Sequence, residues 1–196
     1  MISRRQFLMS AALAAAIPAA PVFALTTSQA SNLVAQVAGQ ITAIMNGGGS
    51  RSRAIGQFEQ VFNRYADVST ISRSVLGPVA RSTSRSELNA FAGALTGYLA
   101  RKYGRNFFDL GGGTLRVQGS RDRGRFVEVS ASATVQGRSN YDVTFRVWDK
   151  SGSPKFIDML VEGVSLVTTE RSEIGALLDQ RGGSVSRLTR DLANLG

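Results

Sequence analysis

The sequence predicts an α+β fold in which helices pack on one antiparallel sheet of four strands. Apolar residues recur every three or four positions in residues 33–99 and again in residues 174–195, which is typical of amphipathic helices. Between these regions, apolar and polar residues alternate with a period of two, which is typical of strands with one buried face. Helices, then strands, then helices favour the α+β class over an alternating α/β fold.

Four helices are expected before the strands and two after them. The fourth has the clearest start, because Ser84 and Glu87 fit a capping box, in which each side chain accepts a hydrogen bond from an unpaired backbone N–H. The segments "NGGGS" (46–50) and "GP" (77–78) end the first and third helices. The apolar stripes are Leu33, Val37, Ile41 and Ile44; Ile55, Phe58, Phe62 and Tyr65; Ile71, Val75 and Leu76; Leu88, Phe91, Leu95, Tyr98 and Leu99; Ile174, Leu177 and Leu178; and Val185, Leu188, Leu192 and Leu195.

Three strands with one apolar face each follow the glycine run at residues 111–113. Short connections containing "RDRG" (121–124) and "GRSN" (137–140) join them, so we expect neighbouring strands to pair antiparallel as a meander. The residues expected on the apolar face are Leu115 and Val117; Val127, Val129, Ala131, Ala133 and Val135; and Tyr141, Val143, Phe145 and Val147.

The stretch "FIDMLVEGVSLV" (156–167) is expected to form a long fourth strand. Both faces of this strand are largely apolar, so each needs an apolar neighbour, which is either more protein or a bound apolar molecule. Strict alternation places Phe156, Leu160, Val164 and Leu166 on one face, and Ile157, Met159, Val161 and Val167 on the other.

The composition is that of one ordinary globular domain, expected to span residues 25–196. Of the 196 residues, 43% are hydrophobic and 19% are charged, which excludes an extensively disordered or collagen-like chain. The absence of cysteine excludes disulfides and thiolate chemistry. The absence of histidine removes the usual base of catalytic serine and cysteine residues and the usual zinc ligand. We therefore expect no metal and no cofactor.

The first 24 residues are expected to be an export signal. Arg4 and Arg5 form its positive end, residues 7–16 its apolar segment, and "VFA" (22–24) a small-residue cleavage site. The string "SRRQFL" (3–8) resembles the twin-arginine signal, although an ordinary secretory signal can also carry two arginines. An uncleaved anchor is the alternative, but a span needs about 20 apolar residues, and two prolines interrupt this run. Either export route leads out of the cytoplasm.

The mature chain is basic. Without Arg4 and Arg5 it keeps 21 basic and 14 acidic residues, a formal charge of +7. This balance favours anionic partners, which outside the cytoplasm are lipid head groups or lipopolysaccharide rather than nucleic acid. The basic segments at residues 50–53, 100–105 and 120–125 are scattered and lie in no nucleic-acid recognition motif. We expect no nucleic-acid partner.

Little in the sequence suggests catalysis. The glycine runs lack the lysine and hydroxyl residue of a phosphate loop, and Ser165 lies outside a nucleophile elbow and has no histidine base. Asp158 and Glu162 lie on one face of the expected strand, where a carboxylate in an apolar cavity could act as a base of raised pKa. The simpler interpretation is that both accept hydrogen bonds or pair with an arginine such as Arg171. We expect no enzymatic activity.

Two blocks of sequence carry a resemblance to a known family. The first spans residues 62–104 and the second residues 158–171, and together they resemble the MlaC family of periplasmic phospholipid-binding proteins, also called toluene-tolerance proteins. The matching residues are Asp67 and Val68, "ISRSVLG" (71–77), Arg81, Phe91, Leu95, Leu99, Arg101 and Tyr103 in the first block, and Asp158, "EGVSLV" (162–167) and Arg171 in the second.

The resemblance implies an NTF2-like fold with an apolar cavity between helices and a curved sheet. It also implies a periplasmic carrier that shuttles phospholipid, as cargo, between the outer membrane and an inner-membrane ABC transporter and so maintains outer-membrane lipid asymmetry. The implied protein partners are an outer-membrane lipoprotein complex and the substrate-binding subunit of the transporter. The alternatives are a small-molecule-binding or isomerase-like enzyme on the same scaffold, and an interaction module with a solid core.

The residues expected to meet the lipid tails come from the apolar faces of the helices and the sheet, where the small residues Ala131 and Ala133 leave room. For each of them the alternative is ordinary packing in a filled core. Arg73, Arg81 and Arg101 are expected to offer donors to the head-group phosphate, or to form docking patches or structural ion pairs. The expected tail contacts are Phe62, Leu76, Phe91, Leu95, Tyr98, Val129, Ala131, Ala133, Val143, Phe145, Val147, Met159 and Val161.

Overall fold

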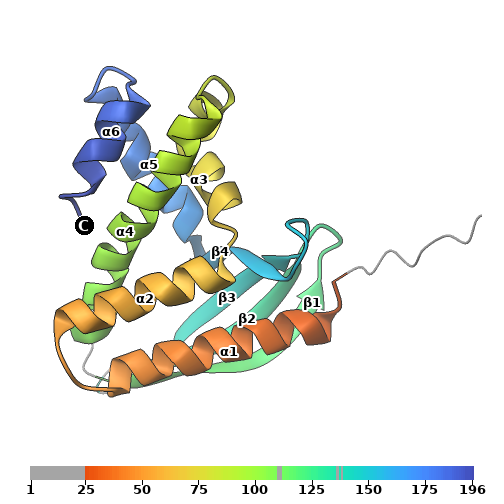
Figure 1. Ribbon diagram of the computed structural model, residues 1–196. Helices are drawn as coiled ribbons and strands as arrows, with labels where there is room; N and C mark the ends of the chain where they lie inside the picture. Colours follow the sequence, from red (N-terminus) through yellow and green to blue (C-terminus); the bar gives the residue numbers. More distant parts are fainter. Residues whose placement is uncertain (1–24, 110–111, 136, 138) are drawn as a thin grey trace, which may run out of the picture.

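The computed structural model describes residues 25–109, 112–135, 137 and 139–196, so the export signal expected in residues 1–24 lies outside the described residues. Helices precede and follow one sheet (Figure 1), which confirms the α+β class. The helices are α1 (Thr27–Asn46), α2 (Arg51–Tyr65), α3 (Val68–Leu76), the short 3₁₀ helix η1 (Gly77–Arg81), α4 (Arg85–Asp109), α5 (Leu166–Asp179) and α6 (Val185–Leu192). The strands are β1 (Gly113–Asp122), β2 (Val127–Val135), β3 (Tyr141–Trp148), β4 (Lys155–Val161) and β5 (Val164–Ser165).

The sheet is the expected antiparallel meander. Its strands lie in the order β1-β2-β3-β4-β5, and each neighbouring pair is antiparallel. The two-residue strand β5 adds a fifth strand to the four that were predicted. In β2 and β3 the alternation holds: Val129 pairs with Phe145 and both are buried, whereas Ser130, the next residue of β2, is exposed.

The stretch 156–167 does not form the single strand that alternation predicts. Strand β4 ends at Val161, and Glu162 and Gly163 turn the chain with φ angles of 50° and 78°. Positive φ angles at both central residues are what a two-residue hairpin turn of type I′ requires. Helix α5 then begins at Leu166, because the Ser165 hydroxyl accepts a hydrogen bond from the backbone N–H of Thr168 at 3.1 Å.

A bulge in β4 also changes which residues share a face. Val147 pairs with Phe156 and Phe145 pairs with Met159, so Ile157 is an extra residue in the strand. Phe156 therefore lies on the same face as Met159, whereas strict alternation places the two on opposite faces. The bulge makes the inner face of β4 continuous with the buried face of β3.

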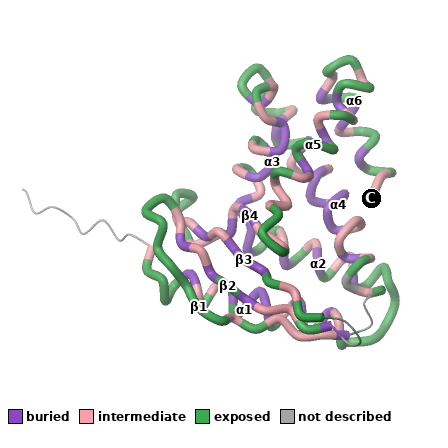
Figure 2. Tube along the Cα trace, turned by 180° about the vertical axis from the view of Figure 1, so that it is seen from behind, coloured by how far each residue is buried: buried purple, intermediate pink, exposed green. Residues whose placement is uncertain are grey.

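The helices form two groups. Helix α1 runs along β1 and β2, and α2 lies between α1 and α4, so these helices cover the inner face of the sheet (Figure 1). The N-terminal part of α4 rises away from the sheet to join α3, α5 and α6. Buried residues form one cluster that runs through both groups, while the β1–β2 hairpin and the tips of the upper helices are exposed (Figure 2). No helix in the described ranges is long and apolar enough to span a membrane.

Two polar connections fix helix starts. The predicted capping box of α4 is confirmed: the Glu87 N–H donates to Ser84 Oγ at 3.2 Å, and the Ser84 N–H donates to Glu87 Oε2 at 3.3 Å. Asp67 caps α3 by accepting from the Thr70 N–H at 2.9 Å, and it also accepts from Trp148 Nε1 at 3.0 Å. Its own N–H donates to the carbonyl of Phe156 at 2.9 Å, so this aspartate joins α3 to the sheet.

Candidate functional site

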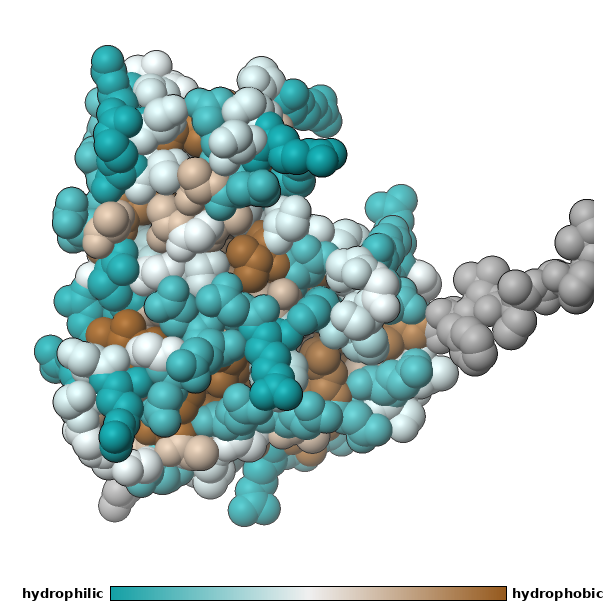
Figure 3. All heavy atoms as spheres, viewed as in Figure 1, coloured by the Kyte–Doolittle hydropathy of each residue, from teal (hydrophilic) through white to brown (hydrophobic). Residues whose placement is uncertain are grey.

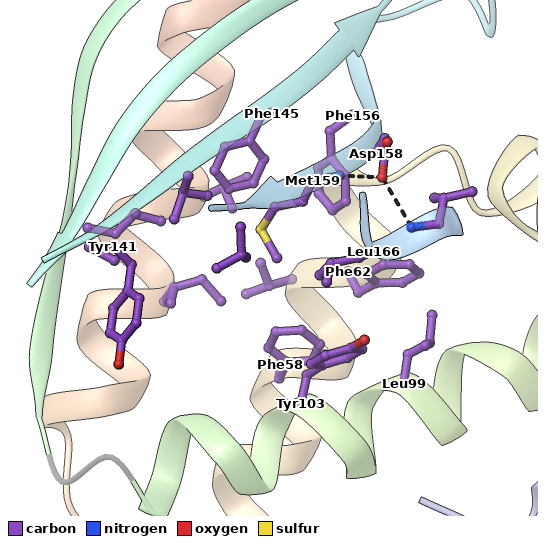
Figure 4. Close-up of a pocket in the computed structure, with 18 of the residues that line it drawn as sticks. Phe58, Phe62, Leu99, Tyr103, Tyr141, Phe145, Phe156, Asp158, Met159 and Leu166 are labelled. Atoms are coloured by element: carbon purple, nitrogen blue, oxygen red, sulfur yellow. Dashed lines mark hydrogen bonds between the residues drawn. The ribbon is translucent and has the colours of Figure 1, made fainter. Parts of the chain in front are cut away.

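A cavity of about 320 Å³ lies between the inner face of the sheet and the helices. Its wall is almost entirely apolar and is contributed by helices α1 to α5 and strands β1 to β4. Figure 4 shows aromatic rings on both sides: Phe145 and Phe156 come from the sheet, and Phe58, Phe62 and Tyr103 from the helices. The cavity volume lies in the range of about 300–1,000 Å³ that is typical of sites for small organic ligands.

Six of the residues expected to meet lipid tails lie on this wall. They come from four elements that are separate in the sequence, and the fold brings them together. They are Phe62, Ala133, Val143, Phe145, Met159 and Val161.

The other seven expected residues are not on the wall. Leu76, the last residue of α3, is buried in the helix core. Phe91, Leu95 and Tyr98 are buried there too, because the first part of α4 packs in the upper helical group and only its later residues Leu99 and Tyr103 reach the cavity. Val129, Ala131 and Val147 are buried on the inner face of the sheet and do not line the cavity, which β2 reaches only at Ala133 and Val135.

Most wall residues were not predicted from the sequence. Several of them belong to the predicted apolar helix stripes, but a stripe does not tell whether its neighbour is another side chain or an empty space. The wall residues that were not predicted are Val37, Ile41, Met45, Phe58, Val61, Ile71, Val75, Leu99, Tyr103, Thr114, Leu115, Val135, Tyr141, Phe156, Asp158, Leu166, Val167 and Glu170.

None of the three arginines proposed for the head group lies on the wall. Arg101 binds the end of α6, donating from Nε to the carbonyl of Leu195 at 2.8 Å and from a terminal nitrogen to that of Leu192 at 2.5 Å. Arg73 and Arg81 are exposed on α3 and η1. A contact of any of the three with a head group or a protein partner stays a prediction.

The carboxylate of Asp158 is fully engaged by the protein. Its Oδ1 accepts from the backbone N–H groups of Met159 at 2.9 Å and Val167 at 3.2 Å, both drawn as dashed lines in Figure 4. Its Oδ2 accepts from Ser165 Oγ at 2.8 Å and from Arg146 at 3.3 Å. Asp158 therefore joins β4 to the start of α5, and its arginine partner is Arg146 rather than Arg171.

A second carboxylate on the wall, that of Glu170, is only half engaged. Its Oε1 accepts from Lys102 Nζ at 2.8 Å and from the Tyr103 hydroxyl at 2.5 Å. Its Oε2 is buried and has no hydrogen-bond partner. A charged residue at this point has a signal in the sequence, because Leu166, Glu170, Ile174 and Leu178 follow one another at intervals of four on α5, which places Glu170 in an apolar stripe.

The groups around Glu170 are shifted in pKa. Burial raises the pKa of the Tyr103 phenol, and the hydrogen bond to Glu170 raises it further. Burial lowers the pKa of the Lys102 ammonium, but the hydrogen bonds to Glu170 and Glu173 outweigh burial, so its pKa is raised overall. Lys102 is therefore charged and Tyr103 is neutral at physiological pH, which leaves Glu170 Oε1 with two firm donors.

The cavity is suited to hold an apolar molecule rather than to catalyse a reaction on a polar one. A cavity left empty in a protein core costs free energy in proportion to its volume. Apolar cavities do not gain from water, because water needs polar partners. An apolar ligand removes the cost.

The fold and the cavity define a class of α+β proteins that enclose an apolar hollow between helices and a sheet. The sequence pattern of one family, described as MlaC protein, matches residues 35–194. The chain therefore belongs to the MlaC family, as its two sequence blocks predicted.

A solved structure has the same fold. It is that of a phospholipid-binding protein from Ralstonia solanacearum in complex with a phospholipid, which is 17% identical to this chain. The match has a TM-score of 0.72 and covers 85% of this chain and 96% of that one. At this identity, the likeness establishes the arrangement of helices and strands.

Proposed function

We propose that this protein is a phospholipid-binding carrier that works in the periplasm. The observation that carries the proposal is the apolar cavity of about 320 Å³ between the sheet and the helices. Two further findings support it: the chain belongs to the MlaC family, and the Ralstonia protein of the same fold was solved with a phospholipid. The export signal expected in residues 1–24 agrees with a site of action outside the cytoplasm.

The physical need for such a carrier follows from the cost of exposing an acyl chain to water. Each CH₂ group contributes about 0.8 kcal/mol, so a chain of about sixteen carbons costs on the order of 12 kcal/mol in water. Moving the chain from a bilayer into a dry apolar cavity exchanges one apolar surrounding for another. The net change in free energy is then small, which allows the carrier both to take up its cargo and to release it.

The tail contacts in this proposal are the six predicted residues on the wall, together with the aromatic residues Phe58 of α2 and Phe156 of β4. The head group stays near solvent. On the face drawn in Figure 3, hydrophobic side chains reach the surface only as small patches among hydrophilic ones, so the cargo is held inside rather than on this face.

The route that we propose runs between the outer membrane and an inner-membrane ABC transporter. An outer-membrane lipoprotein complex and the substrate-binding subunit of the transporter are the proposed docking partners, and the proposed physiological effect is to maintain outer-membrane lipid asymmetry. The support for this route is the family membership of the chain, and the basic mature sequence suits encounters with anionic surfaces.

Lipid content of the purified protein tests the proposal. We expect protein purified without added ligand to carry phospholipid, which native mass spectrometry detects as a mass adduct and thin-layer chromatography identifies in an extract. Protein stripped of lipid should take phospholipid up from vesicles. If gentle preparations are lipid-free and the stripped protein takes up nothing, the carrier assignment is wrong.

The enzyme alternative depends on a free carboxylate that can act as a base. Asp158 was the candidate, and each of its oxygens already accepts two hydrogen bonds from the protein. This engagement favours the structural interpretation of Asp158.

A further inference from the structure

The unpaired oxygen of Glu170 is an unusual feature for the wall of a lipid cavity. Glu170 is 2% exposed, and Oε2 is the only buried side-chain nitrogen or oxygen without a partner in the described part of the chain. Leaving a buried acceptor unpaired costs about 1–3 kcal/mol, and more when it is charged. The other carboxylate on the wall, Asp158, has no such vacancy, because both of its oxygens are engaged.

The surroundings of Glu170 determine which donor suits this oxygen. Lys102 lies 2.8 Å from Oε1 and also pairs with Glu173, so a cation is already in place beside this carboxylate. Burying a second cation, such as an amine head group, in an apolar cavity would cost its desolvation. An ionised carboxylate of a fatty acid would be repelled by Glu170 itself. An uncharged hydroxyl group satisfies the carboxylate without either penalty, and a hydrogen bond to a charged acceptor is stronger than a neutral one.

The carboxylate can meet such a donor from inside the cavity. Glu170 belongs to the wall, on the α5 side, next to Tyr103 and Val167, so the molecule that fills the cavity passes along it. The last torsion of a glutamate side chain has a broad energy minimum, so a small rotation can present Oε2 to the cavity, and the donors of Oε1, Lys102 and Tyr103, must then move with it.

We propose that Glu170 accepts a hydrogen bond from a hydroxyl group carried on the lipid tail, and that the cavity therefore selects hydroxylated acyl chains over plain ones. This inference rests on the proposed function, because it assigns the cargo class of the same cavity. It makes Glu170 a specificity-determining residue of the site.

A competition between matched lipids tests the inference. Mature protein stripped of lipid is incubated with vesicles that contain equal amounts of two phosphatidylcholines, which differ only in a hydroxyl group at carbon 2, 3 or 12 of an acyl chain. The bound lipid is then counted by mass spectrometry. At the position that reaches Glu170, we expect the hydroxylated lipid to be enriched about tenfold.

Two variants on the same helix provide a matched comparison. Glu170→Gln keeps the shape of the side chain but replaces a charge-assisted bond by a neutral one, so we expect the enrichment to fall to about threefold. Glu173→Gln makes the same change at a residue that also binds Lys102 but does not line the cavity, and we expect the full enrichment to remain. Glu170→Leu removes the acceptor and should abolish the enrichment. If that variant does not fold, the two glutamine variants still give the answer.

The possible outcomes separate the inference from the proposed function. Equal uptake of both lipids by the wild type at all three positions overturns the selection by Glu170 but leaves the carrier standing. The same enrichment in the wild type and in Glu170→Gln assigns the selection to another residue and overturns the inference. Uptake of neither lipid overturns the carrier and the inference together.

Discussion

Ala131 and Ala133 are two small residues on the same face of β2, yet their surroundings differ. Ala131 is 3% exposed and belongs to the filled core, whereas Ala133 is only half-buried and lies on the cavity wall. Both were expected to leave room for a lipid. Along β2, the filled core therefore ends and the cavity wall begins between Ala131 and Ala133.

A large side chain should therefore lower lipid uptake at position 133 and lower stability at position 131. We expect Ala133→Phe to fill the cavity and to lower phospholipid uptake severalfold without loss of stability, because the ring enters existing space. Ala131→Phe should lower the free energy of unfolding by about 1–3 kcal/mol, because it overpacks a filled region. Urea denaturation and vesicle uptake assays measure the two effects. Equal destabilisation by both variants would mean that the hollow is not where we place it.

Asp158 has a structural role that can be measured without reference to any activity. In Asp158→Asn the amide nitrogen cannot accept the hydrogen bonds that one oxygen now receives, so we expect a loss of about 2 kcal/mol in the free energy of unfolding. Asp142→Asn, an exposed change on the neighbouring strand, should alter stability by less than about 0.5 kcal/mol. If the two variants melt at the same temperature, the contacts of Asp158 contribute nothing measurable.

The sequence was sufficient to identify apolar faces but not to locate the hollow. Met159 and Phe145 could be assigned to an inward face because each alternates with polar or outward residues. Whether an inward residue such as Phe91 meets a side chain or a void depends on the summed volumes of all its neighbours, which no local pattern contains. Glu170 was missed for a different reason: the predicted strand ran to Val167 and included Leu166, the first residue of the α5 stripe, so the predicted helix stripe began only at Ile174.

The β4–β5 hairpin was not predicted, because the apolar run on both sides of it is typical of one continuous strand. Gly163 permits the turn, but glutamate is not among the residues that usually precede glycine in a two-residue hairpin turn. In the structure, the turn ends the strand and Ser165 starts a helix at once. The bulge at Ile157 had no signal of its own, because the extra residue is itself apolar.

Two glycine substitutions should have opposite effects on stability. Gly163 has a φ of 78° in the hairpin turn, so we expect Gly163→Ala to cost about 1 kcal/mol. Gly93 lies in an exposed turn of α4 where an added Cβ meets nothing within 4 Å, so Gly93→Ala should stabilise by up to about 1 kcal/mol. Thermal unfolding followed by circular dichroism distinguishes the two, and a gain from both would contradict the turn geometry.

The contact between α4 and α5 links the helical group to the cavity wall and should make stability sensitive to alkali. The pKa of Tyr103 is raised from 10.0 in the folded protein, so above about pH 10 the unfolded chain loses this proton while the folded protein keeps it. Stability is then highest below that pH and falls as the pH rises. We expect urea midpoints measured from pH 8 to 11 to decline, and to decline less steeply in Tyr103→Phe. Parallel curves for the two proteins would exclude this contribution.

The order of helices and strands was predictable because each element carries its own periodicity and its own boundary residues, such as the Ser84–Glu87 capping box. The division of the helices into two groups was not, since it depends on how far α4 extends beyond the sheet. The family resemblance predicted that a cavity exists. The structure shows where the cavity lies, and that Oε2 of Glu170 on its wall has no hydrogen-bond partner.

The hollow between sheet and helices also makes the protein responsive to hydrostatic pressure. Unfolding eliminates internal voids, so a protein with a vacant interior is destabilised more strongly by compression than one whose interior is filled. We expect the delipidated form to unfold at lower pressure than the loaded form, with Ala133→Phe between them. Trp148, the single tryptophan, is hydrogen-bonded to Asp67 and provides the fluorescence signal. Identical transition pressures would indicate that cargo does not occupy the void, so compressibility offers a way to read the loading state without any label.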